Sequence, residues 1–549
     1  MNGLMMDVPL STSGIVRRAR QLHPGKPIVS RRADRTIHRT TYGECVDRAV
    51  KLAAALRRLG VRRGDRVATL AWNHWRHLEI YYAVPSSGAV LHTLNLRLHP
   101  DDIAYIANHA EDKVILVDKV LWPLWEKVAP QVRIRHTIVM ADDGEVPSGT
   151  LDYEALIAAE SAGGEFADVP ERRAAAMCYT SGTTGKPKGV VYSHRSLMLH
   201  AIGLALTDAF RLAERDTVLP VVPMFHVNAW GLPFVCGMLG CGQVHPGPHL
   251  DPTSLLELLA AERVTLTAGV PTVWLGILQK LDSAPAAFDL SALHSMVVGG
   301  AAAPEGMMRG FKERHGLTVI HAWGMTETSP LGTISRLTSH IEQLDDATQW
   351  AYRAKQGRPS PLVEIRARGE KGLIPWDGTA MGELEVRGPW IAGAYYHADD
   401  GREAFTEDGW FRTGDVVSID IHGYVTIQDR AKDLVKSGGE WISSVALEGA
   451  LMGHPAVAEA AVIAVPHEKW DERPLAAVVL KEGATADPAE LRFYLMDKFS
   501  KWWIPDEVVI VSAIPKSSAG KFLKSALREQ FRDRYGQANP SLRGLSRSS

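Results

Sequence analysis

The sequence predicts an α/β protein with a large N-terminal domain of several subdomains, built on mostly parallel sheets, and a small, mobile α+β C-terminal domain. Helix-length amphipathic segments alternate with short apolar runs through the first half of the chain. A polar, glycine-containing segment near residue 430 precedes about 120 residues that carry their own helix and strand patterns. A chain of 549 residues is also too long for one compact core.

The N-terminal elements follow from the spacing of apolar residues. Residues 41–59 place Cys45, Ala49, Leu52 and Leu56 on one helical face, and the pattern ends at Gly60. Further segments alternate in the same way, with a helix expected at 101–109 and strands at 66–71, 113–117, 264–270 and 296–300. β-branched, apolar strands of this kind are typical of a parallel sheet that is buried on both faces.

The C-terminal domain is predicted to begin at a short connector. We place the domains at 1–429 and 434–549, with 430–433 as the hinge between them. The second domain carries two predicted helices and two predicted strands, at 445–452, 489–499, 460–465 and 476–480.

Composition excludes several classes of protein. A formal net charge of -2, with 23% charged residues, argues against a basic nucleic-acid-binding surface. The four cysteines form no zinc-type pairs and no dense disulfide pattern, which favours a reducing compartment. Residues 217–250 contain no charged side chain, but prolines, histidines and glycines interrupt them. We therefore expect buried core there, no transmembrane segment and no export signal.

The sharpest local pattern is Tyr179-Thr-Ser-Gly-Thr-Thr-Gly-Lys-Pro-Lys-Gly189. Its glycines let backbone N–H groups approach phosphate oxygens, its hydroxyls donate hydrogen bonds, and Lys186 or Lys188 supplies charge. Because Pro187 follows Lys186, the loop does not fit the Walker motif of P-loop proteins. The predicted polyphosphate-binding residues are Thr180, Ser181, Gly182, Thr183, Thr184, Gly185 and Lys188.

This loop resembles the phosphate-binding signature of the adenylate-forming superfamily, which includes acyl-CoA synthetases, firefly luciferases and nonribosomal peptide adenylation domains. Four further segments resemble motifs of that family and occur in the family's order, at 321–327, 411–415, 429–433 and 515–521. Together they cover essentially the whole chain. The resemblance implies activation of a carboxylic acid with ATP, Mg²⁺ and coenzyme A.

The resemblance also implies a catalytic set. Glu327 matches the magnesium-binding glutamate of the family, and Thr180 matches the loop hydroxyl that approaches the same ion. Thr326 should hold the α-phosphate, and Lys521 should neutralise charge while the carboxylate attacks that phosphate. His226 completes the predicted catalytic set. Oxygen ligands of this kind suit Mg²⁺.

Three segments are expected to surround the nucleotide. Asp415 should accept hydrogen bonds from the ribose hydroxyls, and Arg430 should assist it. The turn at 298–304 should bring Gly300 and Ala301 close to the adenine or the acyl carbonyl. The adenine segment comprises His321, Ala322, Trp323, Gly324 and Thr326. Many members of the family carry Tyr where Trp323 stands, and either ring offers a stacking face.

The second half-reaction requires the thiol of CoA to reach the acyl-adenylate. Members of the family achieve this by rotating the small domain, and Lys432 matches the hinge position. The following segment would then face the CoA channel or the nucleotide, depending on the state. Its predicted binding residues are Lys436, Ser437, Gly438, Gly439 and Trp441.

The segment at 223–231 informs on the acid. Relatives that activate amino acids carry an aspartate where His226 stands, and without it the substrate's ammonium group has no acidic partner. Val227 and Trp230 are predicted to line or gate an apolar tunnel. An amino acid is therefore disfavoured, and a fatty acid fits better.

Segments at 432–445, 452–455 and 466–474 look closest to bacterial medium- and long-chain fatty-acyl-CoA synthetases. That resemblance implies a role in fatty acid metabolism, a homodimer and a cytoplasmic or membrane-adjacent enzyme. Methylthiopropionate-CoA ligases share similar segments, so a short acid stays open. A fatty-acyl-AMP ligase, a luciferase-like oxidoreductase and a non-catalytic nucleotide-binding regulator are further alternatives; the regulator would be expected to lack Lys521 or Glu327.

Overall fold

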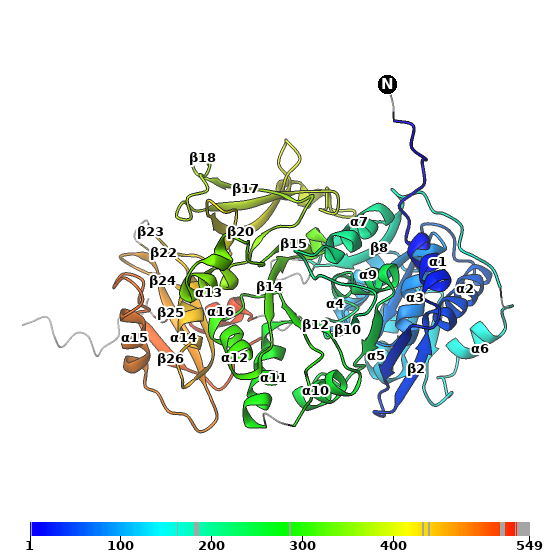
Figure 1. The fold of residues 1–549 in the computed structure, drawn as a ribbon, viewed down its shortest axis with the longest axis horizontal. Coiled ribbons are helices and arrows are strands. Elements are labelled where there is room, and N and C mark those ends of the chain that lie inside the picture. Colours follow the sequence, from blue (N-terminus) through cyan, green and yellow to red (C-terminus); the bar gives the residue numbers. More distant parts are fainter. Residues whose placement is uncertain are drawn as a thin grey trace, which may run out of the picture.

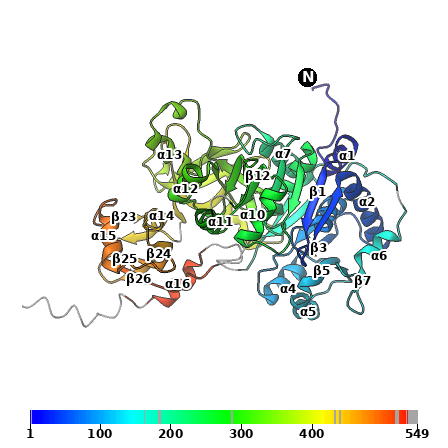
Figure 2. The same cartoon turned by 60° about the horizontal axis from the view of Figure 1, so that its bottom comes forward.

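The computed structural model describes residues 1, 3–161, 163–180, 186–284, 287–430, 433–437, 440–516, 522–532 and 534. Its strands form four sheets. Figure 1 shows the two largest in the body of the molecule and the C-terminal sheet at one end. In the turned view of Figure 2, the C-terminal sheet and its helices form a group beside the large body.

A seven-stranded sheet carries the predicted phosphate loop. Its order is β7-β6-β5-β3-β4-β8-β9, parallel except for β9, which runs antiparallel to β8. The strands are β3 (Arg66–Leu70), β4 (Val90–Thr93), β5 (Val114–Asp118), β6 (His136–Met140), β7 (Leu151–Asp152), β8 (Ala174–Tyr179) and β9 (Gly189–Ser193). The helices connecting or flanking them are α2 (Tyr42–Arg58), α3 (Trp75–Ser86), α4 (Pro100–His109), η1 (Lys119–Leu121), α5 (Trp122–Val128), η2 (Ala129–Gln131), α6 (Tyr153–Ala158) and α7 (His194–Ala205).

A nine-stranded sheet has the order β16-β15-β14-β13-β12-β10-β11-β1-β2, with a parallel centre and antiparallel ends. Its strands are β1 (Pro27–Arg31), β2 (Ile37–Thr41), β10 (Thr217–Pro220), β11 (Gly242–His245), β12 (Leu266–Gly269), β13 (Ser295–Val298), β14 (Val319–Gly324), β15 (Leu331–Ile334) and β16 (Arg358–Pro359). Its helices are α1 (Thr12–Leu22), α8 (Val227–Trp230), α9 (Leu232–Leu239), α10 (Pro252–Ala261), α11 (Pro271–Ser283), α12 (Glu305–His315), η3 (Thr326–Thr328), η4 (Ile341–Gln343) and α13 (Asp346–Ala354).

Two smaller sheets follow. The antiparallel five-stranded sheet contains β17 (Glu364–Gly369), β18 (Gly372–Leu373), β19 (Gly382–Arg387), β20 (Phe411–Ile419) and β21 (Val425–Arg430), with η5 (Asp399–Ala404) before β20. The C-terminal sheet contains β22 (Val435–Ser437), β23 (Glu440–Ile442), β24 (Val457–His467), β25 (Asp471–Leu480) and β26 (Glu507–Ile510). It is accompanied by α14 (Ser444–Met452), α15 (Pro488–Met496) and α16 (Lys524–Gln530).

The main core lies between the two large sheets. Every residue of α3 is buried, because this helix contacts β4 and β8 of one sheet and β1 of the other. The predicted helix at 41–59 is α2, which begins at a capping box formed by Thr41 and Glu44. All five residues of β5 are buried, as the β-branched run predicted.

The fold class predicted from the sequence is confirmed, and some extents differ. β24 and β25 extend beyond the predicted strands because they pair with each other over polar positions that carry no apolar signal. None of the strands of the five-stranded sheet was predicted from the sequence. α12 begins directly after Pro304, its N-cap residue. The predicted boundary at 430–433 starts at the last residue of β21 and ends before β22. It stays a prediction, and positions 431 and 432 lie outside the described residues.

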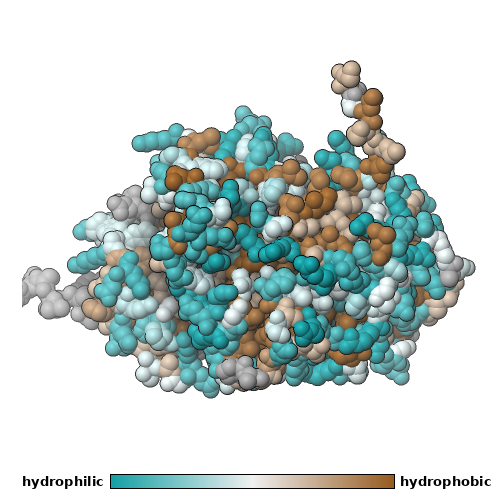
Figure 3. All heavy atoms as spheres, viewed as in Figure 1, coloured by the Kyte–Doolittle hydropathy of each residue, from teal (hydrophilic) through white to brown (hydrophobic). Residues whose placement is uncertain are grey.

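No helix in the described part of the chain is long and apolar enough to cross a membrane. The face shown in Figure 3 mixes hydrophilic and hydrophobic residues. The N-terminal arm stands out from it and exposes Leu4, Met5, Met6 and Val8. All four cysteines are buried and free.

Candidate active site

The predicted phosphate loop connects β8 to β9, and its two ends are fixed to each other. The Thr180 backbone N–H donates to the Lys188 carbonyl at 2.9 Å, and the Lys188 N–H donates to Thr180 Oγ1 at 3.0 Å. Lys188 Nζ lies 5.2 Å from the centre of the Tyr395 ring. The predicted ligands Ser181, Gly182, Thr183, Thr184 and Gly185 lie outside the described residues.

Glu327 lies in the turn that follows β14. Its side chain is buried, and Tyr395 Oη donates a hydrogen bond to Glu327 Oε1 at 2.6 Å. Burial, reinforced by the negative charge of Glu327, raises the pKa of Tyr395, so the phenol keeps its proton. Tyr192 Oη, on β9, donates to the Thr326 carbonyl at 2.8 Å. Contacts thus run from the phosphate loop to Thr326 and Glu327.

The predicted adenine and ribose segments meet at Asp415. Trp323 Nε1, at the end of β14, donates to Asp415 Oδ2 at 2.8 Å. Arg430 Nε lies 2.6 Å from Asp415 Oδ1, because Asp415 and Arg430 are direct partners in the β20–β21 register. Asp415 is only 2% exposed. The ion pair with Arg430 and the hydrogen bond from Trp323 stabilise its buried negative charge.

The other members of the adenine segment are fixed by the backbone. His321 Nδ1 donates to the Ala354 carbonyl at 3.0 Å, and burial lowers the pKa of His321 to about 4. His321 is therefore neutral near pH 7. A Cβ at Gly324 would lie 1.8 Å from the Pro330 carbonyl oxygen, which allows only glycine there. Ala322 is buried beside them.

A small cavity of about 40 Å³ lies beside the turn after β13. Predicted site residues Gly300, His226 and Trp230 line it, whereas Val227 packs in the main core and Ala301 is exposed. Gly300 has φ +83°, a conformation that favours glycine. The remaining lining residues are Asn95, Arg97, Val221, Val222, Pro223, Phe225, Leu250, Val270 and Val273.

The backbone beside this cavity is strained. The four residues of α8, Val227 to Trp230, have φ between +46° and +56°. Each left-handed non-glycine residue costs roughly 1–2 kcal/mol. Strain of this kind persists only where the surrounding structure holds it, and it gathers at ligand-binding sites.

The structure does not bring the predicted CoA-side residues to the phosphate loop. The Lys436 N–H donates to Glu472 and Ser437 Oγ accepts from Arg473, both within the C-terminal sheet. Trp441 pairs with Lys436 through the backbone in β22 and β23, which lie across the molecule from β8 in Figure 1. Lys432, Gly438, Gly439 and Lys521 lie outside the described residues.

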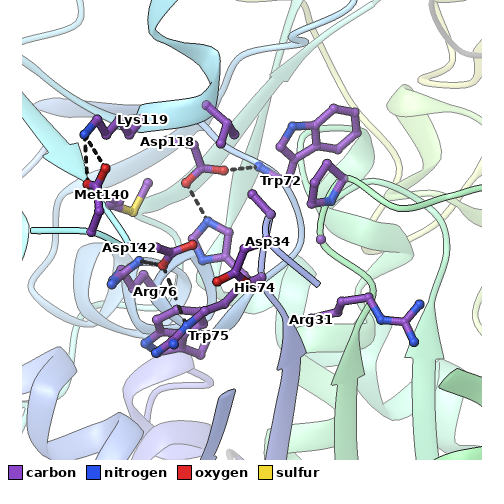
Figure 4. Close-up of a pocket in the computed structure, with 16 residues that line it drawn as sticks. Arg31, Asp34, Trp72, His74, Trp75, Arg76, Asp118, Lys119, Met140 and Asp142 are labelled. Atoms are coloured by element: carbon purple, nitrogen blue, oxygen red, sulfur yellow. Dashed lines mark hydrogen bonds and ion pairs between the residues drawn. The ribbon is translucent and has the colours of Figure 1, made fainter. Parts of the chain in front are cut away.

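A larger hollow of about 610 Å³ opens at the carboxyl ends of β3, β5 and β6. Figure 4 shows His74 directed at Asp118 and Arg76 at Asp142, while Arg31 stands apart from these pairs. His74 pairs with Asp118 at 2.6 Å and Arg76 with Asp142 at 2.8 Å. None of the predicted site residues lines it.

Sequence reasoning missed two tyrosines that hold the η3 turn, Tyr192 and Tyr395. Tyr395 stands in Ala-Gly-Ala-Tyr-Tyr, a segment with no signal for its partner 68 residues earlier. Tyr192 follows the phosphate loop at a position that reads as an ordinary strand residue.

Models of two protein families match the chain. The AMP-binding enzyme model matches residues 16–396, and the AMP-binding enzyme C-terminal domain model matches residues 446–521.

Several characterised proteins are similar over nearly their whole length. A long-chain-fatty-acid–CoA ligase of Thermus thermophilus is 52% identical over 97% of this chain and 98% of its own. A 3-methylmercaptopropionyl-CoA ligase of Ruegeria pomeroyi and a medium-chain-fatty-acid–CoA ligase of Ectopseudomonas oleovorans are each 44% identical over 97% of this chain, and over 99% and 98% of theirs. The crystal structure of ATP-bound MatB from Rhodopseudomonas palustris has a TM-score of 0.81 and 28% identity, covering 95% of this chain and 99% of its own.

Proposed function

Because the chain belongs to the AMP-binding enzyme family, we propose that it is an AMP-forming acid–CoA ligase for medium- to long-chain fatty acids. It would convert the acid, ATP and CoA to acyl-CoA, AMP and diphosphate through an acyl-adenylate. The observation that carries this proposal is the meeting of distant motif segments, in which Trp323 and Arg430 both contact Asp415. The 52% identity to a long-chain-fatty-acid–CoA ligase supports the class of acid.

The first half-reaction brings a carboxylate to the α-phosphate of ATP, and both are anionic. Lys188 and Lys521 would supply positive charge, and Thr326 would hold the α-phosphate. The ligand atoms proposed for Mg²⁺ are the Thr180 hydroxyl and the Glu327 carboxylate. The Glu327 carboxylate fits this cation, because Mg²⁺ prefers oxygen ligands and the carboxylate is buried in the turn after β14. When bound, Mg²⁺ supplies neutralisation of phosphate charge.

The nucleotide would lie between the turn at Gly300, the adenine segment and Asp415. Asp415 would accept the ribose hydroxyls, and Arg430 holds its carboxylate in place. His321 adds no charge near the adenine, since its ring stays neutral near pH 7.

The acid would enter the cavity beside His226 and Trp230. At about 40 Å³ this cavity is far smaller than the roughly 300–1,000 Å³ of ligand pockets, so Trp230 or its neighbours must move to admit a fatty acid. The small size also favours a second candidate, a short acid such as 3-methylthiopropionate, the acid named for a relative at 44% identity.

The second half-reaction needs CoA. We place its binding at Lys436, Ser437 and Trp441, together with Lys432, Gly438 and Gly439, after the domain 434–549 turns about the hinge 430–433 relative to 1–429. The C-terminal family model, which matches residues 446–521, supports a separate unit there.

The exposed apolar arm at 3–8 supports a homodimer. We place the enzyme in the cytoplasm, with peripheral contact to a membrane surface.

The test measures AMP and acyl-CoA formation for saturated acids from acetate to palmitate and for 3-methylthiopropionate, with and without CoA. Thioester with a maximum at medium or long chains would support the proposal. A maximum at 3-methylthiopropionate would make this short acid, and not a fatty acid, the substrate. Adenylate without thioester would indicate a fatty-acyl-AMP ligase. If no acid gave any product, a non-catalytic nucleotide-binding regulator would be the better interpretation.

A further inference from the structure

Tyr395 lies between β19 and η5, outside every segment that the sequence assigned to the site. Its ring packs edge-on against Phe405, with the ring centres 5.7 Å apart. A Cβ at Gly401 would lie 2.6 Å from the Tyr395 ring, so the absence of a side chain there lets the ring pack closely. These neighbours fix the direction in which the phenol points.

The phenol points at Glu327. Tyr395 Oη donates to Glu327 Oε1 at 2.6 Å, within the range of charge-assisted O–H···O⁻ bonds. The same segment holds the turn through its backbone, because the Ala392 N–H donates to the Glu327 carbonyl at 2.7 Å. Both the main chain and the carboxylate of Glu327 are therefore held from one segment.

That segment is also tied to the phosphate loop. The Tyr396 N–H donates to the Gly189 carbonyl at 2.9 Å, directly after the loop ends. Lys188 Nζ lies 5.2 Å from the Tyr395 ring centre. Tyr395 thus bridges the residue proposed to bind Mg²⁺ and a residue proposed to bind phosphate.

We propose that Tyr395 is a positioning residue that orients the Glu327 carboxylate toward the divalent cation bound with ATP. This inference rests on the proposed role of Glu327. Its basis is general: carboxylates that ligate a metal are themselves hydrogen-bonded, and losing such a partner lowers metal affinity or activity about 10–100-fold.

The experiment compares the full-length enzyme with Tyr395→Phe, which keeps the ring and removes the hydroxyl. Mn²⁺ serves as the probe, and its dissociation constant is measured by electron paramagnetic resonance on the enzyme saturated with α,β-methylene-ATP. We expect Mn²⁺ to bind about 10–100-fold more weakly. Acyl-CoA formation should need more Mg²⁺ for half-maximal rate, while kcat at saturating Mg²⁺ changes less.

Tyr396→Phe is the matched control. Its ring stacks on His397 with the centres 4.0 Å apart, and among the described residues its hydroxyl has no hydrogen bond. Mn²⁺ affinity should be unchanged in this variant. An equal loss in both variants would indicate a general disturbance of the segment and overturn the inference.

Glu327→Gln separates this inference from the proposed function. If Glu327→Gln weakens Mn²⁺ binding and Tyr395→Phe leaves it unchanged, the positioning role of Tyr395 is wrong and the metal role of Glu327 stands. If neither variant changes Mn²⁺ affinity, Glu327 is not a metal ligand and both assignments are wrong. Weaker binding in both variants supports the inference.

Discussion

The proposed nucleotide site and the large hollow of Figure 4 both lie at carboxyl ends of parallel strands and both contain charged groups. They differ in what those groups join. At Asp415 and Glu327 the contacts join the end of β14 in the nine-stranded sheet to the five-stranded sheet and to the segment after β19. In the hollow, His74 and Arg76, which follow β3, pair with carboxylates at the ends of β5 and β6 in the same sheet. Size and charge alone therefore do not identify a catalytic site, and substitutions should affect activity in one region and stability in the other.

The largest effect is expected for Lys521→Ala. Removing the charge that offsets the carboxylate and α-phosphate should slow adenylate formation about 10²–10³-fold, as with other groups that stabilise transition-state charge. Thioester formation from supplied acyl-AMP should fall far less. Lys516→Ala is the control, because Lys516 pairs with Glu459 on the C-terminal sheet. An equal loss in both half-reactions would contradict the role given to Lys521.

Asp118→Ala tests the other side of the comparison. Asp118 accepts from the Trp72 N–H at 2.8 Å and pairs with the buried His74, so its removal leaves the partly buried Trp72 N–H and the His74 ring without this partner. At about 1–2 kcal/mol each, we expect the free energy of unfolding to fall by about 2–4 kcal/mol. Urea denaturation measures this, and kcat at 25 °C should stay close to wild type.

Asp143→Ala is the matched control within the same hollow. Its ion pair with Lys119 is largely exposed, so the free energy of unfolding should change little. A large loss of activity with either variant, at full folding, would make the hollow part of the catalytic apparatus.

The sequence predicted the fold class and placed most helices and strands because their signals are local. The spacing of apolar residues, the glycine that ends the pattern and the β-branched run were sufficient to predict α2, β5 and α14. The five-stranded sheet was missed because its strands, such as β17 and β19, carry charged residues at alternate positions and resemble a polar connection.

In the candidate site, too, local motifs predicted individual residues but not the contacts between them. Motifs indicated Asp415 and Glu327, but not that Trp323 would donate to Asp415 or that Tyr395 would donate to Glu327. Those contacts depend on how the five-stranded sheet and the segment after β19 pack on β14. Such packing joins pairs of residues that lie 68 and 92 positions apart in the sequence, and no local pattern specifies it.

Stability should fall in mild acid, and His245 beside the hollow should contribute. Its side chain is fully buried, and neither ring nitrogen has a hydrogen-bond partner among the described residues. Burial, with smaller effects of His74 and His77, lowers the pKa of His245 from 6.5 to about 3. In the unfolded chain the His245 ring is protonated below about pH 6.5, whereas in the folded protein it stays neutral down to about pH 3. The free energy of unfolding therefore decreases as pH falls through this range.

His245→Leu should remove this contribution. Between pH 7 and pH 5 the free energy of unfolding should decrease by about 2 kcal/mol less in the variant than in the wild type. Urea denaturation at both pH values measures the difference. Equal losses in the two proteins would mean that His245 takes up its proton in the folded state.

The smallest effect, on specificity, is expected for Trp230→Ala. Trp230 is 6% exposed and lines the cavity of about 40 Å³, so its removal should admit longer chains. We expect the ratio of kcat/KM for palmitate to that for octanoate to rise about 10-fold, the size of effect that a few methylene contacts produce. Trp230→Phe keeps an aromatic ring and should shift the ratio less. An unchanged ratio in a folded Trp230→Ala enzyme would assign Trp230 to core packing, and the strained turn at 227–230 would then need a reason other than binding the acid.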